Sequence, residues 1–274
     1  MQSVAPEESI MTHGAHIKAI CKLLHGFAYR HDLHRLFSDC MEATAIAISN
    51  SVDLANREKR EARYLEIVGH YDREVVDAFP KVLGELVLAL DAEPGDVLGA
   101  VYAELEQGSK DRGQYFTPYP VAQLMAGVTI GNRESVEEII KRNGFVRAME
   151  PACGAGAMVI ALAETMREEG IKYQQHLHVT AVDIDPRAVH MAYIQFALLH
   201  IPAAVVHGNS LSLEMHECWY TPAHILGGWT AKLARREAEE GAYALLAAPP
   251  RASAPTIEPA SAPANNSPQQ LSLF

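Results

Sequence analysis

A glycine-bearing turn near the middle of the chain limits the possible folds more than any other feature. The turn is Glu150-Pro151-Ala152-Cys153-Gly154-Ala155-Gly156, and it lies between an apolar segment, Phe145–Met149, and an apolar helical pattern. Two more apolar segments follow, His178–Val182 and Ala204–His207, with a second helical pattern between them. Short strands that alternate with helices predict a parallel, right-handed βαβαβ unit. We therefore expect an α/β fold in this part of the chain.

The turn and one acidic residue predict a binding site. Gly154 and Gly156 would let the backbone approach a ligand closely, although a turn that serves packing alone would have the same composition. Asp183 directly follows the second strand segment, and the carboxyl ends of parallel strands meet at one edge of a sheet. A carboxylate in that place can accept both hydroxyls of a ribose. Turn and acid together indicate a nucleoside cofactor.

The flanking regions have different patterns. From about His13 to Gln107 apolar residues recur at helical spacing, as Ile17, Ile20 and Leu24 do. The stretch Pro249–Gln269 consists mainly of Pro, Ala, Ser and Asn, which cannot bury enough apolar surface to fold. We expect an all-helical region over residues 1–107, an α/β core over 108–248 and a disordered tail over 249–274.

Composition excludes several classes of function. The net charge of −11 means that any contact with DNA must use a local basic patch. The 4 cysteines lie far apart and the 13 histidines form no ligand set, so we expect reduced thiols and no metal. The sequence contains no signal peptide and no long apolar run. We therefore expect a cytoplasmic protein with no membrane partner.

The residues of the turn resemble a motif of a known family. Glu150–Gly156 closely resembles the S-adenosylmethionine motif of amino (adenine-N6) DNA methyltransferases, usually Asp-Pro-Ala-Cys-Gly-Ser-Gly. Gly113–Pro118 and Asp96–Tyr102 resemble the segments before that motif in modification subunits of type I restriction systems. Ala181–Pro186 and Gly208–Leu211 then follow in the family's order. The resemblance implies a Rossmann-like S-adenosylmethionine-dependent methyltransferase core, with a complete or a truncated sheet, behind the all-helical region.

The resemblance also assigns roles to individual residues. Three of them would border the methionine end of S-adenosylmethionine: Phe116, Thr117 and Pro118. Four would line the turn under the methionine and ribose: Glu150, Cys153, Gly154 and Gly156. Asp183 would hold the ribose hydroxyls. Asn209 would accept from the adenine amino group, more weakly than the Asp that the family usually has there.

The catalytic motif of the family is missing. Adenine-N6 methyltransferases carry Asn-Pro-Pro-Phe or Asp-Pro-Pro-Tyr after the fourth strand, where it binds and stacks the flipped base. The Pro-Pro pair here is Pro249-Pro250, which either follows a relic fourth strand, Tyr243–Ala248, or begins the linker. A substitute catalytic site would combine four residues: Asn209, Trp219, Tyr220 and His224. The competing interpretation is that Trp219 only packs the last helix. The family's target-recognition domain is also missing from the sequence.

The last residues of the sequence predict a partner. Gln270-Leu271-Ser272-Leu273-Phe274 resembles the motif by which bacterial DNA polymerases and repair proteins dock on the replication sliding clamp. Gln270 offers an amide for the rim of a pocket, and Leu271, Leu273 and Phe274 offer apolar anchors. The alternatives are a stray apolar end, or a strand that folds back on the body of the protein.

These observations lead to one functional expectation and two alternatives. We expect low-specificity adenine-N6 methylation of DNA, with single strands at least as good a substrate as duplex, and recruitment by the sliding clamp. The first alternative is a catalytically silent cofactor fold that binds DNA or the clamp as a regulator or antirestriction factor. The second is a methyltransferase whose site is completed by a partner subunit.

Overall fold

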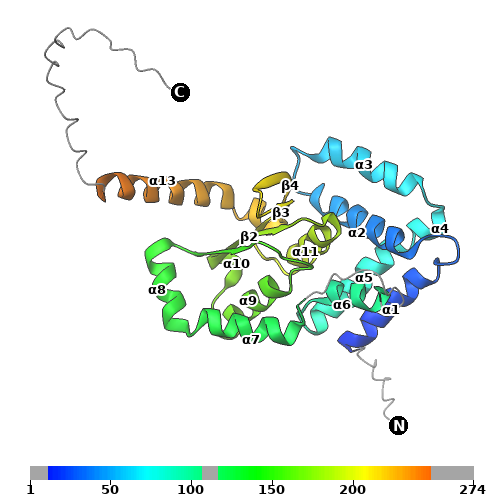
Figure 1. Ribbon diagram of the computed structural model, residues 1–274, viewed down its shortest axis with the longest axis horizontal. Coiled ribbons are helices and arrows are strands. Elements are labelled where there is room, and N and C mark those ends of the chain that lie inside the picture. Colours follow the sequence, from blue (N-terminus) through cyan, green and yellow to red (C-terminus); the bar gives the residue numbers. More distant parts are fainter. Residues whose placement is uncertain (1–11, 107–116, 248–274) are drawn as a thin grey trace, which may run out of the picture. The chain divides into compact units, whose positions relative to one another are not determined.

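The computed structural model describes residues 12–106 and 117–247 (Figure 1). Helical periodicity between His13 and Gln107 is confirmed for the described residues, which form helices joined by short connections. They are α1 (His13–His25), α2 (Leu33–Ser49), α3 (Arg57–Gly69), α4 (Arg73–Val76), α5 (Phe79–Ala92) and α6 (Val97–Glu106). The chain divides into two compact units, residues 1–234 and residues 235–274.

Strands and helices alternate in the rest of the described chain, as the sequence predicts. After α7 (Tyr119–Ile130) and α8 (Arg133–Asn143) come the elements of the sheet and its connections. These are β1 (Val146–Glu150), α9 (Ala157–Glu168), α10 (Tyr173–His176), β2 (Leu177–Asp183), α11 (Pro186–Leu198), β3 (Ala203–Asn209) and β4 (Glu214–Tyr220). Two helices follow the sheet, α12 (Pro222–Leu226) and α13 (Trp229–Ala247).

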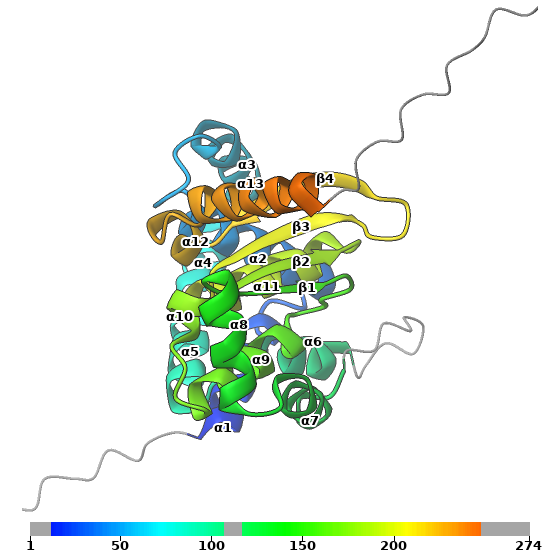
Figure 2. The same ribbon diagram turned by 90° about the vertical axis from the view of Figure 1, so that its left-hand side faces the viewer.

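The sheet contains the predicted parallel unit and one strand that the sequence did not predict. Its order is β1-β2-β3-β4, and Figure 2 shows the strands side by side in that order. β1 pairs in parallel with β2, and β2 with β3, which confirms the α/β fold class with a small sheet. β4 pairs antiparallel with β3, so Asn209 lies opposite Glu214 and Ala204 lies opposite Tyr220.

The helical region and the sheet share one hydrophobic core. α11 packs against β2 and β3, and it also packs against α2. A single cluster of buried side chains extends from Ile20 in α1, through Phe37 in α2 and Phe196 in α11, to Trp219 in β4. Because burial of apolar surface is the main stabilising contribution to a fold, the helices and the sheet stabilise each other.

A buried arginine joins the helical region to β4. Arg60 of α3 is 3% exposed, and its Nη1 lies 2.7 Å from Oδ2 of Asp53. The guanidinium also donates to Ser49 Oγ and, over 3.1 Å, to the carbonyl oxygen of Cys218. Its Cζ lies 3.9 Å from the centroid of the Trp219 ring. This set of contacts fixes the position of β4 against α2 and α3.

The chain leaves the sheet at Thr221, which has no exposed surface. Its hydroxyl donates to the carbonyl oxygen of Ile201 over 2.8 Å and accepts from the Ala203 N–H over 2.9 Å. Thr221 also caps α12, because the same hydroxyl accepts from the N–H of His224. Thr221 and Pro222 thus begin α12 as an N-cap and a proline in the first turn.

The interpretation of Tyr243–Ala248 as a relic fourth strand is wrong for its described residues. Tyr243–Ala247 forms the end of α13, which begins at Trp229 after a break at Gly227 and Gly228. Helix formers such as Ala and Leu predominate there, and they favour continuation of the helix. Ala248 and the Pro249-Pro250 pair lie outside the described residues.

We expect Arg60→Met to destabilise the protein by about 3–5 kcal/mol, because it leaves the Asp53 carboxylate buried without its cation. Urea denaturation followed by circular dichroism measures the change. Arg73→Met is the matched control, since Arg73 pairs with Asp77 at the surface, 3.6 Å away, and exposed ion pairs contribute little. Equal loss of stability in the two variants would contradict the proposed role of Arg60.

Candidate cofactor site

The turn between β1 and α9 uses glycines where the backbone requires them. Gly154 has φ 54° and Gly156 has φ 103°, both in a region that side chains disfavour. The N–H of Cys153 donates to the carbonyl oxygen of Val182 over 2.9 Å, and the N–H of Gly154 donates to Oδ2 of Asp183 over 2.8 Å. The turn is therefore bound to the end of β2, as the parallel arrangement predicts.

Asp183 is held in a fixed position at the end of β2. Its side chain is nearly buried, with 8% of the residue exposed. Oδ2 accepts from Gly154, and Oδ1 accepts from the N–H of Asp185 over 2.9 Å. An ionised carboxylate can accept about four hydrogen bonds. Asp183 therefore keeps acceptor capacity for the hydroxyls of a ribose.

Acidic groups dominate the electrostatics of the turn. Burial raises the pKa of the Cys153 thiol, and the nearby carboxylates of Asp183 and Glu150 raise it further, so the thiol stays neutral. Oε1 of Glu150 accepts from the N–H of Ala152 over 3.2 Å. A neutral thiol beside two carboxylates suits a ligand with positive charge.

Helix α11 contacts the glycine turn through two residues that the sequence analysis missed, Gln195 and Phe196. A Cβ atom on Gly156 would lie 2.4 Å from Cε1 of Phe196, so the turn passes directly over this ring. Nε2 of Gln195 donates to the carbonyl oxygen of Ala155 over 2.8 Å. Glycine at position 156 is thus required by packing as well as by φ. A Gln in the middle of an apolar helix gives no sequence signal for such a role.

These features fit S-adenosylmethionine, the cofactor expected from the sequence. Asp183 offers acceptors for the ribose, and Gly154 and Gly156 place no Cβ atom at their two positions in the turn. The carboxylates of Glu150 and Asp183 suit the ammonium and sulfonium charges of the cofactor. The turn, Glu150 and Asp183 are therefore brought together as predicted.

Asn209 lies at the end of β3, at the same edge of the sheet as Glu150 and Asp183. Its Oδ1 accepts from the N–H of Leu211 over 2.9 Å and from the N–H of Ser212 over 3.2 Å. This oxygen therefore shapes the turn into β4 and is not free for an adenine amino group. The side-chain NH₂ of Asn209 is the group that remains for an adenine ring nitrogen.

The structure does not bring the other candidate catalytic residues to Asn209. Tyr220 pairs with Ala204, five positions before Asn209 on β3, and at ~3.3 Å per residue the two ends lie about 16 Å apart. His224 contacts His178, at the start of β2, with a distance of 2.8 Å between Nε2 of His178 and Nδ1 of His224. Tyr220 and His224 thus lie at the opposite edge of the sheet, because antiparallel β4 returns the chain there.

Trp219 is part of the core. It is 2% exposed and packs between the guanidinium of Arg60 and the rings of His190 and Tyr193. His224 is also buried, and burial lowers its pKa. The packing interpretation of Trp219 therefore agrees with the structure, although the partners are on α3 and α11 rather than on the last helix.

The remaining predicted site residues are only partly described. Thr117 and Pro118 are exposed and precede α7, whose N-cap is Pro118. Phe116 lies outside the described residues. So do the four residues predicted to bind the clamp, Gln270, Leu271, Leu273 and Phe274.

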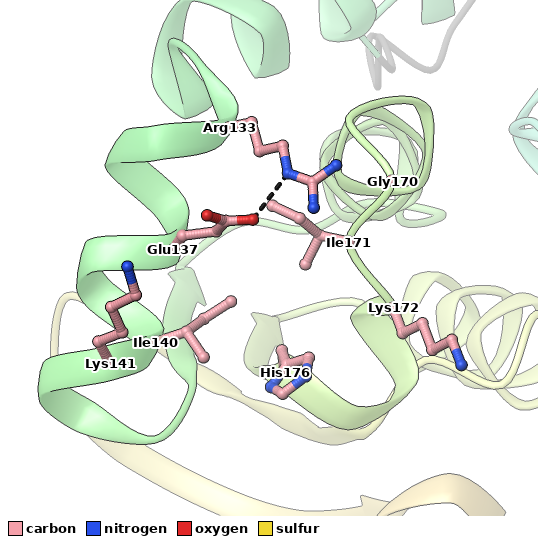
Figure 3. A pocket seen from close by; sticks show the side chains of 8 residues that line it. All are labelled: Arg133, Glu137, Ile140, Lys141, Gly170, Ile171, Lys172 and His176. Carbon is pink, nitrogen blue, oxygen red and sulfur yellow. Dashed lines mark hydrogen bonds and ion pairs between the residues drawn. The ribbon is translucent and has the colours of Figure 1, made fainter.

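A separate cavity of about 330 Å³ lies between α8 and the loop before α10 (Figure 3). Ile140 and Ile171 form apolar walls, and Arg133 is paired with Glu137 over 2.7 Å. In Figure 3 the ammonium group of Lys172 points away from the cavity. The cationic groups do not converge on one point, so this cavity is not a second candidate for an anionic cofactor.

The described residues form neither a metal-binding cluster nor a membrane-spanning helix. Within residues 12–106 and 117–247, no group of three or more His, Cys, Asp or Glu side chains is placed to hold a metal ion. None of the helices in these ranges is both long enough and apolar enough to span a bilayer.

Three solved structures resemble the chain at low sequence identity. A protein from Vibrio vulnificus described as a modification subunit of a type I restriction enzyme is 11% identical, with a TM-score of 0.44; the match covers 75% of this chain and 58% of that one. A type I restriction-modification methyltransferase subunit from Streptococcus thermophilus is 14% identical, with a TM-score of 0.39 and coverages of 70% and 57%. A protein from Listeria monocytogenes described as a class I S-adenosylmethionine-dependent methyltransferase is 14% identical, with a TM-score of 0.39 and coverages of 72% and 54%.

The chain thus spans between 54% and 58% of the length of these three structures. No protein of curated function matches it. The model of the family described as N-6 DNA methylase, however, matches residues 94–234, which is more than half of the sequence. The matched span includes the glycine turn, Asp183 and Asn209, and the family implies S-adenosylmethionine as cofactor. The chain belongs to the N-6 DNA methylase family.

Proposed function

We propose that this protein binds S-adenosylmethionine at the Glu150–Gly156 turn and Asp183, and transfers its methyl group to N6 of adenine in DNA. One observation carries the proposal: the Asp183 carboxylate is fixed against the N–H of Gly154, 2.8 Å away, at the edge where the strands end. Membership of the N-6 DNA methylase family supports it.

Each residue of the site has a defined task in this proposal. Asp183 accepts from the ribose hydroxyls, and Glu150 faces the positively charged methionine end. The NH₂ of Asn209 donates to an adenine ring nitrogen. Thr117 and Pro118 border the methionine from the start of α7. When bound, the cofactor supplies an electrophilic methyl group.

We further propose that the protein has low sequence specificity and takes its location from the sliding clamp. The Gln270–Phe274 motif resembles a clamp-docking peptide and would supply an address on replicating DNA. Single strands occur there, and a base in a single strand needs little unpairing to enter a site.

A second candidate function is a binding protein without turnover. The observation that favours it is the separation of Tyr220 and His224 from Asn209 by the length of β3. Trp219 and Tyr220, the aromatic residues predicted to stack a target base, pair with Val205 and Ala204 at the start of β3, away from the glycine turn. Such a protein would bind the cofactor and occupy DNA or the clamp as a regulator.

Asp183→Ala should weaken S-adenosylmethionine binding roughly ten- to a hundred-fold, because it removes a charge-assisted hydrogen bond of about 1.5–3 kcal/mol. Titration calorimetry measures the affinity. Asp185→Ala is the control, because the Asp185 carboxylate caps α11 and pairs with Arg187 over 2.6 Å. No binding by the wild type would remove the cofactor proposal, and equal loss in both variants would contradict the role of Asp183.

We expect methyl transfer from labelled cofactor to adenine N6, with single-stranded oligonucleotides at least as good as the matching duplex. Mass spectrometry of the digested product identifies the modified base, and Asp183→Ala provides the inactive control. Transfer only to one long duplex site would contradict low specificity. Cofactor binding without transfer to any DNA would favour the binding protein.

Replacement of both Leu273 and Phe274 by Ala should abolish binding to purified sliding clamp. Each buried apolar side chain contributes about 1.5–3 kcal/mol, and ordering the peptide offsets part of this, so we expect micromolar affinity for the wild type. Surface plasmon resonance measures it, with Ser272→Ala as the control that leaves both anchors in place. S-adenosylmethionine binding should be unchanged in every variant. Equal clamp affinity of the double variant and the wild type would refute the clamp proposal.

A further inference from the structure

Gln195 is fully buried on α11 and satisfies all of its hydrogen-bonding groups. Its Nε2 donates to the carbonyl oxygen of Ala155 over 2.8 Å and to Oδ1 of Asp96 over 2.9 Å. Its Oε1 accepts from the N–H of Leu98 over 3.0 Å. One side chain thus joins three elements: α11, the glycine turn and the first turn of α6.

The start of α6 is built closely around this contact. Oδ1 of Asp96 also accepts from the N–H of Gly99 over 2.9 Å. A Cβ atom on Gly99 would lie 2.1 Å from Oδ2 of Asp96, so only glycine admits the carboxylate there. Burial raises the pKa of Asp96, while the hydrogen bonds from Gln195 and Gly99 oppose that shift. A buried carboxyl group of this kind is costly unless its partners stay in place.

The neighbouring residue acts on the same turn. The Phe196 ring lies under Gly156, and Gln195 holds the carbonyl group of the preceding residue, Ala155. Adjacent positions on α11 therefore restrain the turn by packing and by hydrogen bonding. Because Gln195 also binds the start of α6, the position of the glycine turn depends on where α6 begins.

We propose that Gln195 is a positioning residue that holds the cofactor turn against the start of α6, and so couples cofactor binding to the order of the helical region. The inference rests on the cofactor site proposed above. The start of α6 matters for the cofactor site because α6 leads along the chain to residues predicted to border the cofactor. The chain passes from α6 through residues 107–116 to Thr117 and Pro118, which are predicted to border the methionine.

Two measurements on the wild type and on Gln195→Met test the proposal. Met has a similar length but cannot make these hydrogen bonds, so S-adenosylmethionine affinity should fall about tenfold, the effect of about one lost buried hydrogen bond. Amide hydrogen exchange reports the coupling. Cofactor should slow exchange at Leu98 and Gly99 in the wild type, because their N–H groups donate to Gln195 and Asp96. It should have little effect on them in Gln195→Met.

A control variant separates positioning from general loss of stability. Ile194→Val trims a fully buried neighbour on α11 and so lowers stability without touching the hydrogen bonds of Gln195. Its cofactor affinity should stay within about twofold of the wild type.

The outcomes distinguish this inference from the proposed function. No cofactor binding by the wild type would overturn both. Cofactor binding that leaves exchange at Leu98 and Gly99 unchanged in the wild type would overturn this inference alone, and so would equal affinity of Gln195→Met and the wild type. The wild-type exchange measurement decides the matter even if Gln195→Met does not fold.

Discussion

The passage of the chain from β1 into α9 is the constraint on which the rest of the site depends. The backbone must pass between the Phe196 ring on one side and the Asp183 carboxylate on the other. Only glycine fits at position 156, where both φ and packing exclude a side chain. The position of α11 follows from this, because Gln195 and Phe196 must both reach the turn. The strand-tip carboxylate is then fixed where a ribose can meet it.

The helical region contributes to this arrangement as part of the same core. α2 packs on α11, α6 begins at the hydrogen bonds of Gln195, and Arg60 binds β4 through Cys218 and Trp219. Interiors are close-packed, so displacement of one element is felt by its neighbours. The helices therefore act as a support for the sheet and the cofactor turn. The span that matches the family model begins at residue 94 and so includes α6, one of the supporting helices.

Local patterns in the sequence were sufficient for the parallel unit and the cofactor turn. Apolar runs predict β1, β2 and β3, and the helical pattern between the second and third runs predicts α11, because these signals act within a few residues. β4 was missed because only Trp219 in it is buried, so the segment has no apolar pattern. The separation of His224 from Asn209 depends on the direction of β4, which is a long-range property. The roles of Gln195 and Arg60 likewise depend on partners that are distant in the sequence.

The hydrogen bonds of Thr221 have a mechanical consequence. The described chain leaves β4 here, at the edge opposite the cofactor turn, and His224 of α12 adds a contact to His178 on β2. A tension applied beyond α12 would act first on these contacts of Thr221 and His224. It would have to pass along the length of the strands before it reached Asn209 and Asp183. The cofactor turn thus lies at the end of the sheet that such a load would reach last.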